Sequence, residues 1–541
     1  MSSQKVKGKQ VIDTADDDNE LSADESGGSE PERSTNEPSV QTSSSKKKKK
    51  KKSKLAKILN PVSGAAEDKL VETVLENIKA ERADADEDTV RAALQQLNLK
   101  DVVAGKSDLA GKNQKDTGGH KFWATQPVPQ YGEGSPEEDG YIEPPKPPEE
   151  LKQRPDLLPK DFEWATVDID DPAQLKEVYE LLSANYVEDD DASFRFNYSA
   201  GFLKWALQPP GYYKEWHLGV RVAANKKLVA FISGVPVTLR VRQKEIKASE
   251  INFLCVIKKL RHKRLAPVLI REVTRQCNLK GISQAIYTAG VFLPTPVSTC
   301  RYYHRSLNVP KLLDVKFTYI PRNSTRARMI LQYKLPSTPE LTASGLREME
   351  ERDVEQVSDL YKRYMDRFDM SPLMTVEEVR HNFLSGKGTG EIDPSGRREG
   401  QVLWVYVVED PGTKKITDFF SFFSLPSSVI GNIKHSVLDA AYLYYYATET
   451  AFEPQAEESG ALKRRLEDLI KDALVVADQA KFDVFNALTL MDNVPLLEPL
   501  KFGAGDGLLN YYLYNWRTSP LAGMEGRDGV KPGQGVGVVM I

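Results

Sequence analysis

The last seven residues of the chain, GVGVVMI at 535–541, alternate glycine with apolar side chains and finish on Ile541. Most chains end in a polar tail that frays, whereas this pattern favours a buried end. A buried end would keep the chain's own α-carboxylate, which can accept a proton or a hydrogen bond, inside the protein. The alternative is a terminal edge strand that is packed only for stability.

A basic segment at 252–273, NFLCVIKKLRHKRLAPVLIREV, has the residues of an anion site. A strand is expected to end near Val256, and a helix to open at about 265–267. Backbone N–H groups at a helix N-terminus, together with the helix dipole, attract anions, and nearby cations strengthen the site. The segment therefore predicts a pyrophosphate-binding loop, although an exposed basic turn is the alternative. The loop cations are Lys258, Lys259, Arg261, Lys263 and Arg264.

Two further groups of residues carry less specific signals. The acidic run VEDDD at 187–191 is, on its own, typical of a solvated loop. The three cysteines, Cys255, Cys277 and Cys300, have neither C-x-x-C nor zinc-site spacing. We therefore expect free thiols in a reducing compartment and no metal site.

Length and composition place these groups in a globular body that follows a polar tail. The chain has 541 residues, of which 40% are hydrophobic, which suffices for two or three domains. Residues 1–112 have no aromatic side chain, so we expect a disordered tail. Its run SSSKKKKKKKSK is either a solvated linker or a patch for RNA, ribosomes or nuclear import. With no signal peptide and no membrane span in the sequence, we expect a soluble, cytoplasmic protein.

The elements that would position these groups occur twice in the same order. Each half is predicted to contain two helices, three strands, a long helix and a strand, after a proline-rich arm at 122–164 whose aromatics need a surface to pack on. Asp171 is the expected N-cap of the first helix, with Pro172 at its first position. The ranges are 171–186, 199–207, 215–222, 228–241, 250–257, 265–279 and 284–289, then 352–368, 375–384, 401–409, 416–426, 436–448, 461–480 and 482–490.

A mostly antiparallel sheet interrupted by one helix, with a basic loop at that helix's start, resembles the acyl-CoA-binding acetyltransferase (GNAT) superfamily. Arg264 departs from that superfamily's pattern, since it stands where glycine is common. Longer blocks are similar to those of the N-myristoyltransferases over about residues 115–541. These blocks include FWATQPVP, NYVEDDDASFRF, EINFLCV, YTAGVFLPTPVSTCRYYHRSLN, FDVFNALTLMDN and KFGAGDGLLNYYLYNW.

The resemblance implies an α/β (α+β) fold of two pseudo-twofold, acetyltransferase-like halves. The domains would be a disordered tail at 1–112, an acyl-CoA-binding half with its arm at 113–340, and a peptide-binding half at 341–541. The implied activity is transfer of a myristoyl group from myristoyl-CoA, a co-substrate, to an N-terminal glycine. We expect no cofactor, no metal and a monomer.

The resemblance also implies an acyl-CoA site. Backbone N–H groups of Phe253 and Leu254 would hold the thioester oxygen, next to Cys255 and Val256, and the α-carboxylate of Ile541 would be the base that deprotonates the glycine amine. A covalent mechanism through Cys255 is a less favoured alternative. The CoA would be covered by His120, Lys121, Phe122 and Trp123, and its phosphates held by Arg261, His262, Lys263, Arg264, Leu265, Ala266 and Pro267.

On the peptide side, the resemblance implies that acidic residues face the basic residues common in myristoylated N-termini, and that aromatics line a groove. The substrates would be N-terminal glycine peptides and nascent proteins. The implied peptide-site residues are Tyr186, Glu188, Asp189, Asp191, Phe194, Phe196, Thr288, His304, Ser427, Asn486, Asp506 and Leu509. A different class of function, a ribosome- or RNA-associated binding protein that uses the polylysine arm, remains the alternative.

Overall fold

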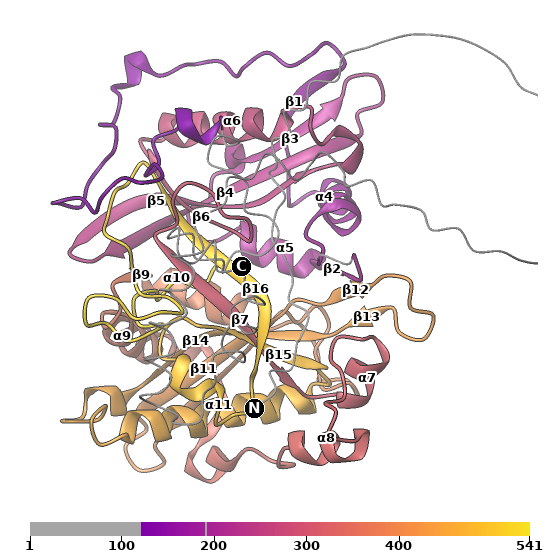
Figure 1. Ribbon diagram of the computed structural model, residues 1–541, viewed down its shortest axis with the longest axis vertical. Helices are drawn as coiled ribbons and strands as arrows, with labels where there is room; N and C mark the ends of the chain where they lie inside the picture. Colours follow the sequence, from indigo (N-terminus) through magenta and orange to yellow (C-terminus); the bar gives the residue numbers. More distant parts are fainter. Residues whose placement is uncertain (1–120, 190–191) are drawn as a thin grey trace, which may run out of the picture. The chain divides into compact units, whose positions relative to one another are not determined.

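A computed structural model describes residues 121–189 and 192–541 of the chain (Figure 1). The predictions made for the tail at 1–112, for His120 and for Asp191 lie outside the described residues.

The described chain alternates helices with strands, and most strands join one large sheet. The helices are α4 (Pro172–Asn185), α5 (Ala200–Leu207), α6 (Leu265–Leu279), α7 (Val309–Asp314), α8 (Arg326–Tyr333), α9 (Val354–Met365), α10 (Val376–Arg380), α11 (Ala461–Gln479) and α12 (Val494–Leu497). The strands are β1 (Phe162–Thr166), β2 (Phe194–Phe196), β3 (His217–Val222), β4 (Leu228–Val241), β5 (Lys244–Val256), β6 (Gln284–Ala289), β7 (Ser298–Ser306), β8 (Leu346–Glu348), β9 (Met370–Pro372), β10 (Leu403–Glu409), β11 (Ile416–Ser424), β12 (Ser427–Val429), β13 (Val437–Leu438), β14 (Ala440–Thr448), β15 (Val484–Leu488) and β16 (Gly503–Tyr514).

The order of strands in the 13-stranded sheet is itself twofold. It runs β1-β3-β4-β5-β6-β16-β7-β15-β14-β11-β10-β8, with β9 paired to β4 off this path. Read from either edge, three antiparallel pairings lead to one parallel pairing, β5 with β6 on one side and β14 with β15 on the other. The expected twofold α/β architecture is confirmed by this order.

The two half-sheets are joined by an exchange of strands. β7 follows β6 in the sequence but pairs with β15, whereas β16 follows β15 and pairs with β6. The exchanged strands then pair antiparallel with each other at the centre of the sheet. Strands from both sides of the boundary predicted at residue 340 therefore pair in one continuous sheet. The division of the chain into two domains at that residue stays a prediction.

Local sequence accounts for where many elements begin. The Asp171 side chain accepts a hydrogen bond from the N–H of Ala173 at 2.9 Å, and Pro172 opens α4, as predicted. α6 and β4 have the predicted bounds. The range 375–384 is instead a short α10, capped by Thr375, that passes into a π-helix at His381–Ser385. No strand was predicted at β1, β2, β7, β8, β9, β12 or β16.

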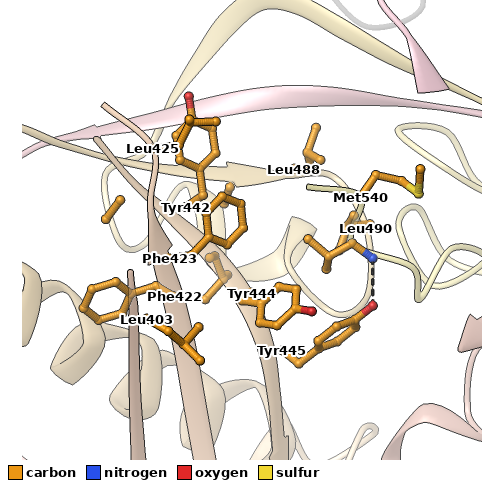
Figure 2. Packing of buried hydrophobic residues seen from close by; sticks show 14 of the residues in the cluster. Leu403, Phe422, Phe423, Leu425, Tyr442, Tyr444, Tyr445, Leu488, Leu490 and Met540 are labelled. Atoms are coloured by element: carbon orange, nitrogen blue, oxygen red, sulfur yellow. Dashed lines mark hydrogen bonds between the residues drawn. The ribbon is translucent and has the colours of Figure 1, made fainter. Parts of the chain in front are cut away.

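The chain end is buried, as its composition predicts. Val536, Val538, Val539 and Met540 are each less than 9% exposed, and half-buried Ile541 packs against the same core. The N–H of Gly537 donates to the Met370 carbonyl at 2.7 Å. Figure 2 shows Met540 in the cluster that also contains Tyr444 and Tyr445.

Close approach explains the two glycines of this segment. A Cβ at Gly535 would lie 2.4 Å from the backbone N of Ala522, and a Cβ at Gly537 would lie 3.1 Å from the Met370 carbonyl oxygen. A backbone atom cannot move aside as the tip of a flexible side chain can. The glycines therefore allow the final segment to reach its position.

The first prediction concerns Gly535. Gly535→Ala should lower the free energy of unfolding by about 1–3 kcal/mol, because overpacking forces the backbone to shift. Gly134→Ala is the matched control, since nothing lies within 4 Å of a Cβ there, and it should change stability by less than about 0.5 kcal/mol. Denaturant unfolding of both variants measures this, and equal stabilities would contradict the close packing.

Candidate active site

A β-bulge in β5 presents the residues expected to bind the acyl carbonyl. Phe231 pairs with Cys255 and Ser233 pairs with Asn252, so Phe253 and Leu254 together lie opposite one residue of β4. Phe253 has a positive φ of 57°. A bulge of this kind breaks the regular ladder and redirects the backbone, which is the local distortion that a backbone anion site requires.

Tyr186, assigned to the peptide groove from the sequence, lies at this bulge. Its ring centroid is 6.1 Å from that of Phe253. Burial raises the pKa of the Tyr186 phenol far above its ordinary value, and a hydrogen bond from the Phe253 N–H opposes the rise. The Phe253 N–H is therefore directed at the phenol oxygen of Tyr186.

A second bulge occupies the twofold-related place in the other half-sheet. Phe420 pairs with Tyr446 and Phe422 with Leu443, so two residues of β14, Tyr444 and Tyr445, lie opposite Ser421. The Ser421 hydroxyl donates to the Tyr445 carbonyl at 2.7 Å. This bulge faces the chain end: the N–H of Val539 donates to the Tyr445 phenol oxygen at 3.1 Å (Figure 2).

The chain end is held from β16 as well. The Tyr511 hydroxyl donates to the carbonyl of Val538 at 3.0 Å. Tyr445 and Tyr511 are residues that the sequence analysis missed, because a tyrosine inside an apolar strand carries no signal that its hydroxyl holds a distant segment.

An apolar cavity opens where β5 and β6 separate. The two strands pair only over 248–250 and 284–286. The cavity has about 740 Å³ of empty space, its open part included. Its lining includes Trp123, Ile232, Ile251, Asn252, Leu254, Ile270, Val273, Cys277, Tyr287, Thr288 and Leu293.

The aromatic arm closes one side of this cavity. Trp123 is buried and stacks on Tyr287 with a centroid distance of 5.4 Å, and Phe122 meets Trp123 edge to face at 5.3 Å. Lys121 is exposed at the start of the arm. The packing surface that these aromatics require is therefore the cavity wall.

The basic loop ends at the N-terminus of α6, beside the cavity. His262 and Arg264 have φ values of 65° and 58°, a region where glycine is less strained. His262, Lys263 and Arg264 are exposed, while Leu265, Ala266 and Pro267 in the first turn are half-buried. The Arg261 guanidinium donates to the Asn185 carbonyl. The loop thus brings cations and a helix N-terminus to one place.

The acidic run is tied into the protein. Glu188 forms ion pairs with Arg195 and Lys258; burial raises the pKa of its carboxyl, but these two cations outweigh the effect and leave it lowered. Asp189 is 5% exposed and accepts the N–H of Phe194 at 2.7 Å. The run therefore anchors β2 and the basic loop, and its proposed contact with basic peptides stays a prediction.

A smaller pocket collects several peptide-side residues. His304 Nδ1 lies 2.6 Å from Asn486 Oδ1, and both line the pocket with buried Phe196. Buried Ser427 pairs with Phe196 in the β2–β12 ladder. The remaining lining was not predicted from the sequence, and it comprises Tyr302, Phe317, Leu438, Ala440, Tyr442 and Val484.

The other predicted peptide residues are dispersed. Buried Phe194 packs edge to face on Phe317 at 5.8 Å, on the side of the smaller pocket. Thr288 lines the larger cavity. Asp506 is exposed in the irregular part of β16, and Leu509 is buried in the same strand. The structure therefore groups Phe196, His304 and Asn486 most closely.

Among residues 121–189 and 192–541, no helix has the length and apolar character that crossing a membrane requires. The same residues contain no group of three or more His, Cys, Asp or Glu side chains arranged to hold a metal ion.

Comparison with known proteins identifies the family. Residues 141–300 match the family described as Myristoyl-CoA:protein N-myristoyltransferase, N-terminal domain, and residues 314–539 match its C-terminal domain. The chain belongs to the N-myristoyltransferase family. It is therefore an acyltransferase, and the fold class inferred from the twofold pattern is confirmed.

Relatives match over most of their length. The glycylpeptide N-tetradecanoyltransferase of Aspergillus fumigatus is 52% identical over 479 residues, covering 87% of this chain and 94% of the relative. The enzyme of the same name from Saccharomyces cerevisiae is 48% identical over 457 residues, covering 83% and 97%. A crystal structure of Saccharomyces cerevisiae N-myristoyltransferase with bound myristoyl-CoA superposes with a TM-score of 0.72 at 48% identity, covering 78% of this chain and 99% of that one.

Cys255 is a free, buried cysteine. Burial raises the pKa of its thiol to about 12, although the charge of Arg261 opposes the rise, and the thiolate is the reactive form. We predict that Cys255→Ala keeps kcat within a few-fold of wild type. Mass analysis of the intact protein after incubation with acyl-CoA provides the check, and an acyl adduct on Cys255 would contradict direct attack.

Glu250 provides a pH-dependent prediction. Asn252 donates to its carboxylate at 2.7 Å, but burial raises its pKa from 4.5 to about 7. Between these two values the folded state binds a proton that the unfolded state does not, so this group's contribution to the free energy of unfolding falls as pH rises.

The variant Glu250→Gln cannot ionise and should escape this loss. From about pH 5 to about pH 8 its stability relative to wild type should rise by about 2 kcal/mol. Denaturant unfolding at both pH values measures the difference, with exposed Glu245→Gln as the control. Stability curves that stay parallel would show that Glu250 ionises normally.

Proposed function

We propose that the chain transfers a myristoyl group from myristoyl-CoA to the N-terminal glycine amine of protein substrates. The observation that carries the proposal is the apolar cavity that begins directly beside the β5 bulge. An acyl chain lying in that cavity would bring its thioester to the bulge. The myristoyl-CoA seen in the yeast relative supports the same ligand here.

The proposed reaction is direct attack. The amine nitrogen would bond to the thioester carbon, the carbon–sulfur bond would then break, and CoA would leave as a thiol after taking up a proton. Backbone N–H groups at Phe253 and Leu254 would stabilise the negative oxygen of the intermediate, and the loss of one such donor typically costs about a hundredfold or more in rate. The Phe253 N–H would exchange the Tyr186 oxygen for the acyl oxygen.

The remaining groups bind and orient the two substrates. Exposed Lys263 and Arg264, with the N-terminus of α6, would neutralise CoA phosphates. Trp123 and Phe122 would cover the CoA at the cavity wall. The pocket that contains His304 and Asn486 would accept the peptide, and its polar pair suits a hydroxyl-bearing residue near the glycine.

A proton acceptor is also required, because an α-amine has a pKa of about 7.7–8.0 and is largely protonated near neutral pH. We assign this role to the α-carboxylate of Ile541. Support comes from two hydrogen bonds that hold the chain end: Tyr511 binds Val538, and Tyr445 binds Val539. Tyr445 belongs to the β14 bulge, which is related by twofold symmetry to the β5 bulge at Phe253 and Leu254.

The activity is tested by incubating the full chain with myristoyl-CoA and an octapeptide that begins with glycine. We expect the peptide to gain the mass of one myristoyl group, and a peptide that begins with alanine to remain unmodified. Failure to modify the glycine peptide would refute the proposal. The alternative of ribosome or RNA binding rests on the lysine run at 46–52, outside the described residues, and a cytoplasmic location also stays a prediction.

The base assignment generates its own prediction. Extending the chain beyond Ile541 by a few residues should lower kcat by about a hundredfold or more, the scale of a lost general base, with little change in myristoyl-CoA affinity. The same residues added at the N-terminus are the control. Single-turnover kinetics and acyl-CoA binding measure the two effects, and wild-type turnover by the extended chain would remove the carboxylate from the mechanism.

A further inference from the structure

Exposed apolar side chains gather in two neighbouring segments that the proposed reaction does not use. The described residues have twelve exposed large hydrophobic side chains, of which six lie within 319–331 and 430–433. Leu331 is 72% exposed and Ile433 is 106% exposed. We refer to these six side chains as the α8 face, and they are Tyr319, Ile320, Ile330, Leu331, Ile430 and Ile433.

α8 has apolar side chains on both sides. Met329 and Tyr333, one turn apart, are buried against the protein. Ala327, Ile330 and Leu331 are exposed and, with i, i+3 and i+4 spacing, form a stripe on the other side of the helix. A helix that only covers the core has polar residues there, so this stripe indicates contact with something outside the chain.

The two segments meet at Asp314, the last residue of α7. Its carboxylate pairs with Arg326 at the start of α8, with Lys434 and with His435 in the β12–β13 turn. The Asn432 side chain also donates to the Asp314 carbonyl at 3.3 Å. Figure 1 shows α7, α8 and the β12–β13 turn on one side of the molecule. The segments that carry the six exposed side chains are therefore neighbours.

Cations outnumber carboxylates on this face, where Asp314 pairs with Arg326 and Lys434. Residues 315–334 and 426–438 contain no Asp or Glu. Their exposed cations are Lys316, Arg322, Arg326, Arg328, Lys334 and Lys434. Cations around apolar side chains are typical of protein surfaces that lie on anionic lipid, where the charges meet headgroups and the apolar groups enter the boundary with the acyl chains.

We propose that the α8 face docks on an anionic membrane surface. A nucleic acid would satisfy the cations, but its bases stack on aromatic rings, and five of the six apolar side chains are aliphatic. The face also adjoins the peptide-side pocket: Phe317, whose ring lies 5.3 Å from that of His304, precedes it, and Ser427 begins β12. Docking there would hold the peptide-side pocket near the bilayer. The docking proposal does not depend on the proposed acyl-transfer reaction.

Hydrogen exchange of the full chain tests the docking site directly. Vesicles that contain phosphatidylserine should slow amide exchange in residues 326–334 and 427–437, whereas vesicles of phosphatidylcholine alone should not. Because this readout is local, binding through the lysine run at 46–52 cannot produce it. Unchanged exchange in both segments with anionic vesicles would overturn the proposal.

Vesicle co-sedimentation of variants gives an independent measurement. The double variant Leu331→Ser, Ile433→Ser should bind anionic vesicles about tenfold more weakly or worse, since two aliphatic side chains that would enter the membrane boundary are lost. The matched control is Leu157→Ser, Ile392→Ser, which removes exposed aliphatic side chains elsewhere and should bind like wild type. Both double variants should acylate short peptides normally, which shows that they are folded.

Other occupants of the face would produce distinguishable results. Slower exchange in these segments with RNA in place of vesicles would assign the face to nucleic acid. Slower exchange that increases with protein concentration, without vesicles, would assign it to a second copy of the chain. Either result, or equal vesicle binding by the Leu331→Ser, Ile433→Ser variant and wild type, contradicts membrane docking.

Discussion

The antiparallel pairing of β16 with β7 is the interaction on which the rest of the structure depends. Each strand follows one half of the repeat in sequence and completes the sheet of the other half. Without this exchange the halves would be two sheets with exposed edges at β6 and β15, and such edges are prone to aggregate. β16 also leads directly into 515–541, so the same pairing determines where the final segment can pack.

The twofold repeat supplies two bulges, and the chain uses them differently. The bulge at Phe253 and Leu254 lies at the apolar cavity that opens where β5 and β6 separate. The bulge at Tyr444 and Tyr445 lies among filled core, and there the Tyr445 hydroxyl holds the chain end. One bulge thus borders apolar space, and the other holds the C-terminal segment.

The sequence predicts the bounds of helices and strands better than it predicts which strands or side chains contact one another. α6 and β4 are found within their predicted bounds because their apolar periodicity and flanking residues are local signals. β16 was missed because its glycines interrupt the alternation, and the exchange of β7 and β16 could not be predicted because no local pattern specifies which distant strand a strand pairs with. Similarly, the run VEDDD indicates acidic residues but not that Arg195 and Lys258 neutralise Glu188.

The proposed reaction requires the thioester to lie between the apolar cavity and the β5 bulge. A crystal structure of the chain with a non-hydrolysable thioether or ketone analogue of myristoyl-CoA tests it most directly. The account predicts the acyl chain among Ile251, Leu254 and Val273, and the carbonyl oxygen of the ketone analogue within about 3 Å of the Phe253 and Leu254 backbone nitrogens, the distance of an oxyanion donor. An acyl chain bound outside this cavity, or a carbonyl oxygen turned away from the bulge, would contradict it.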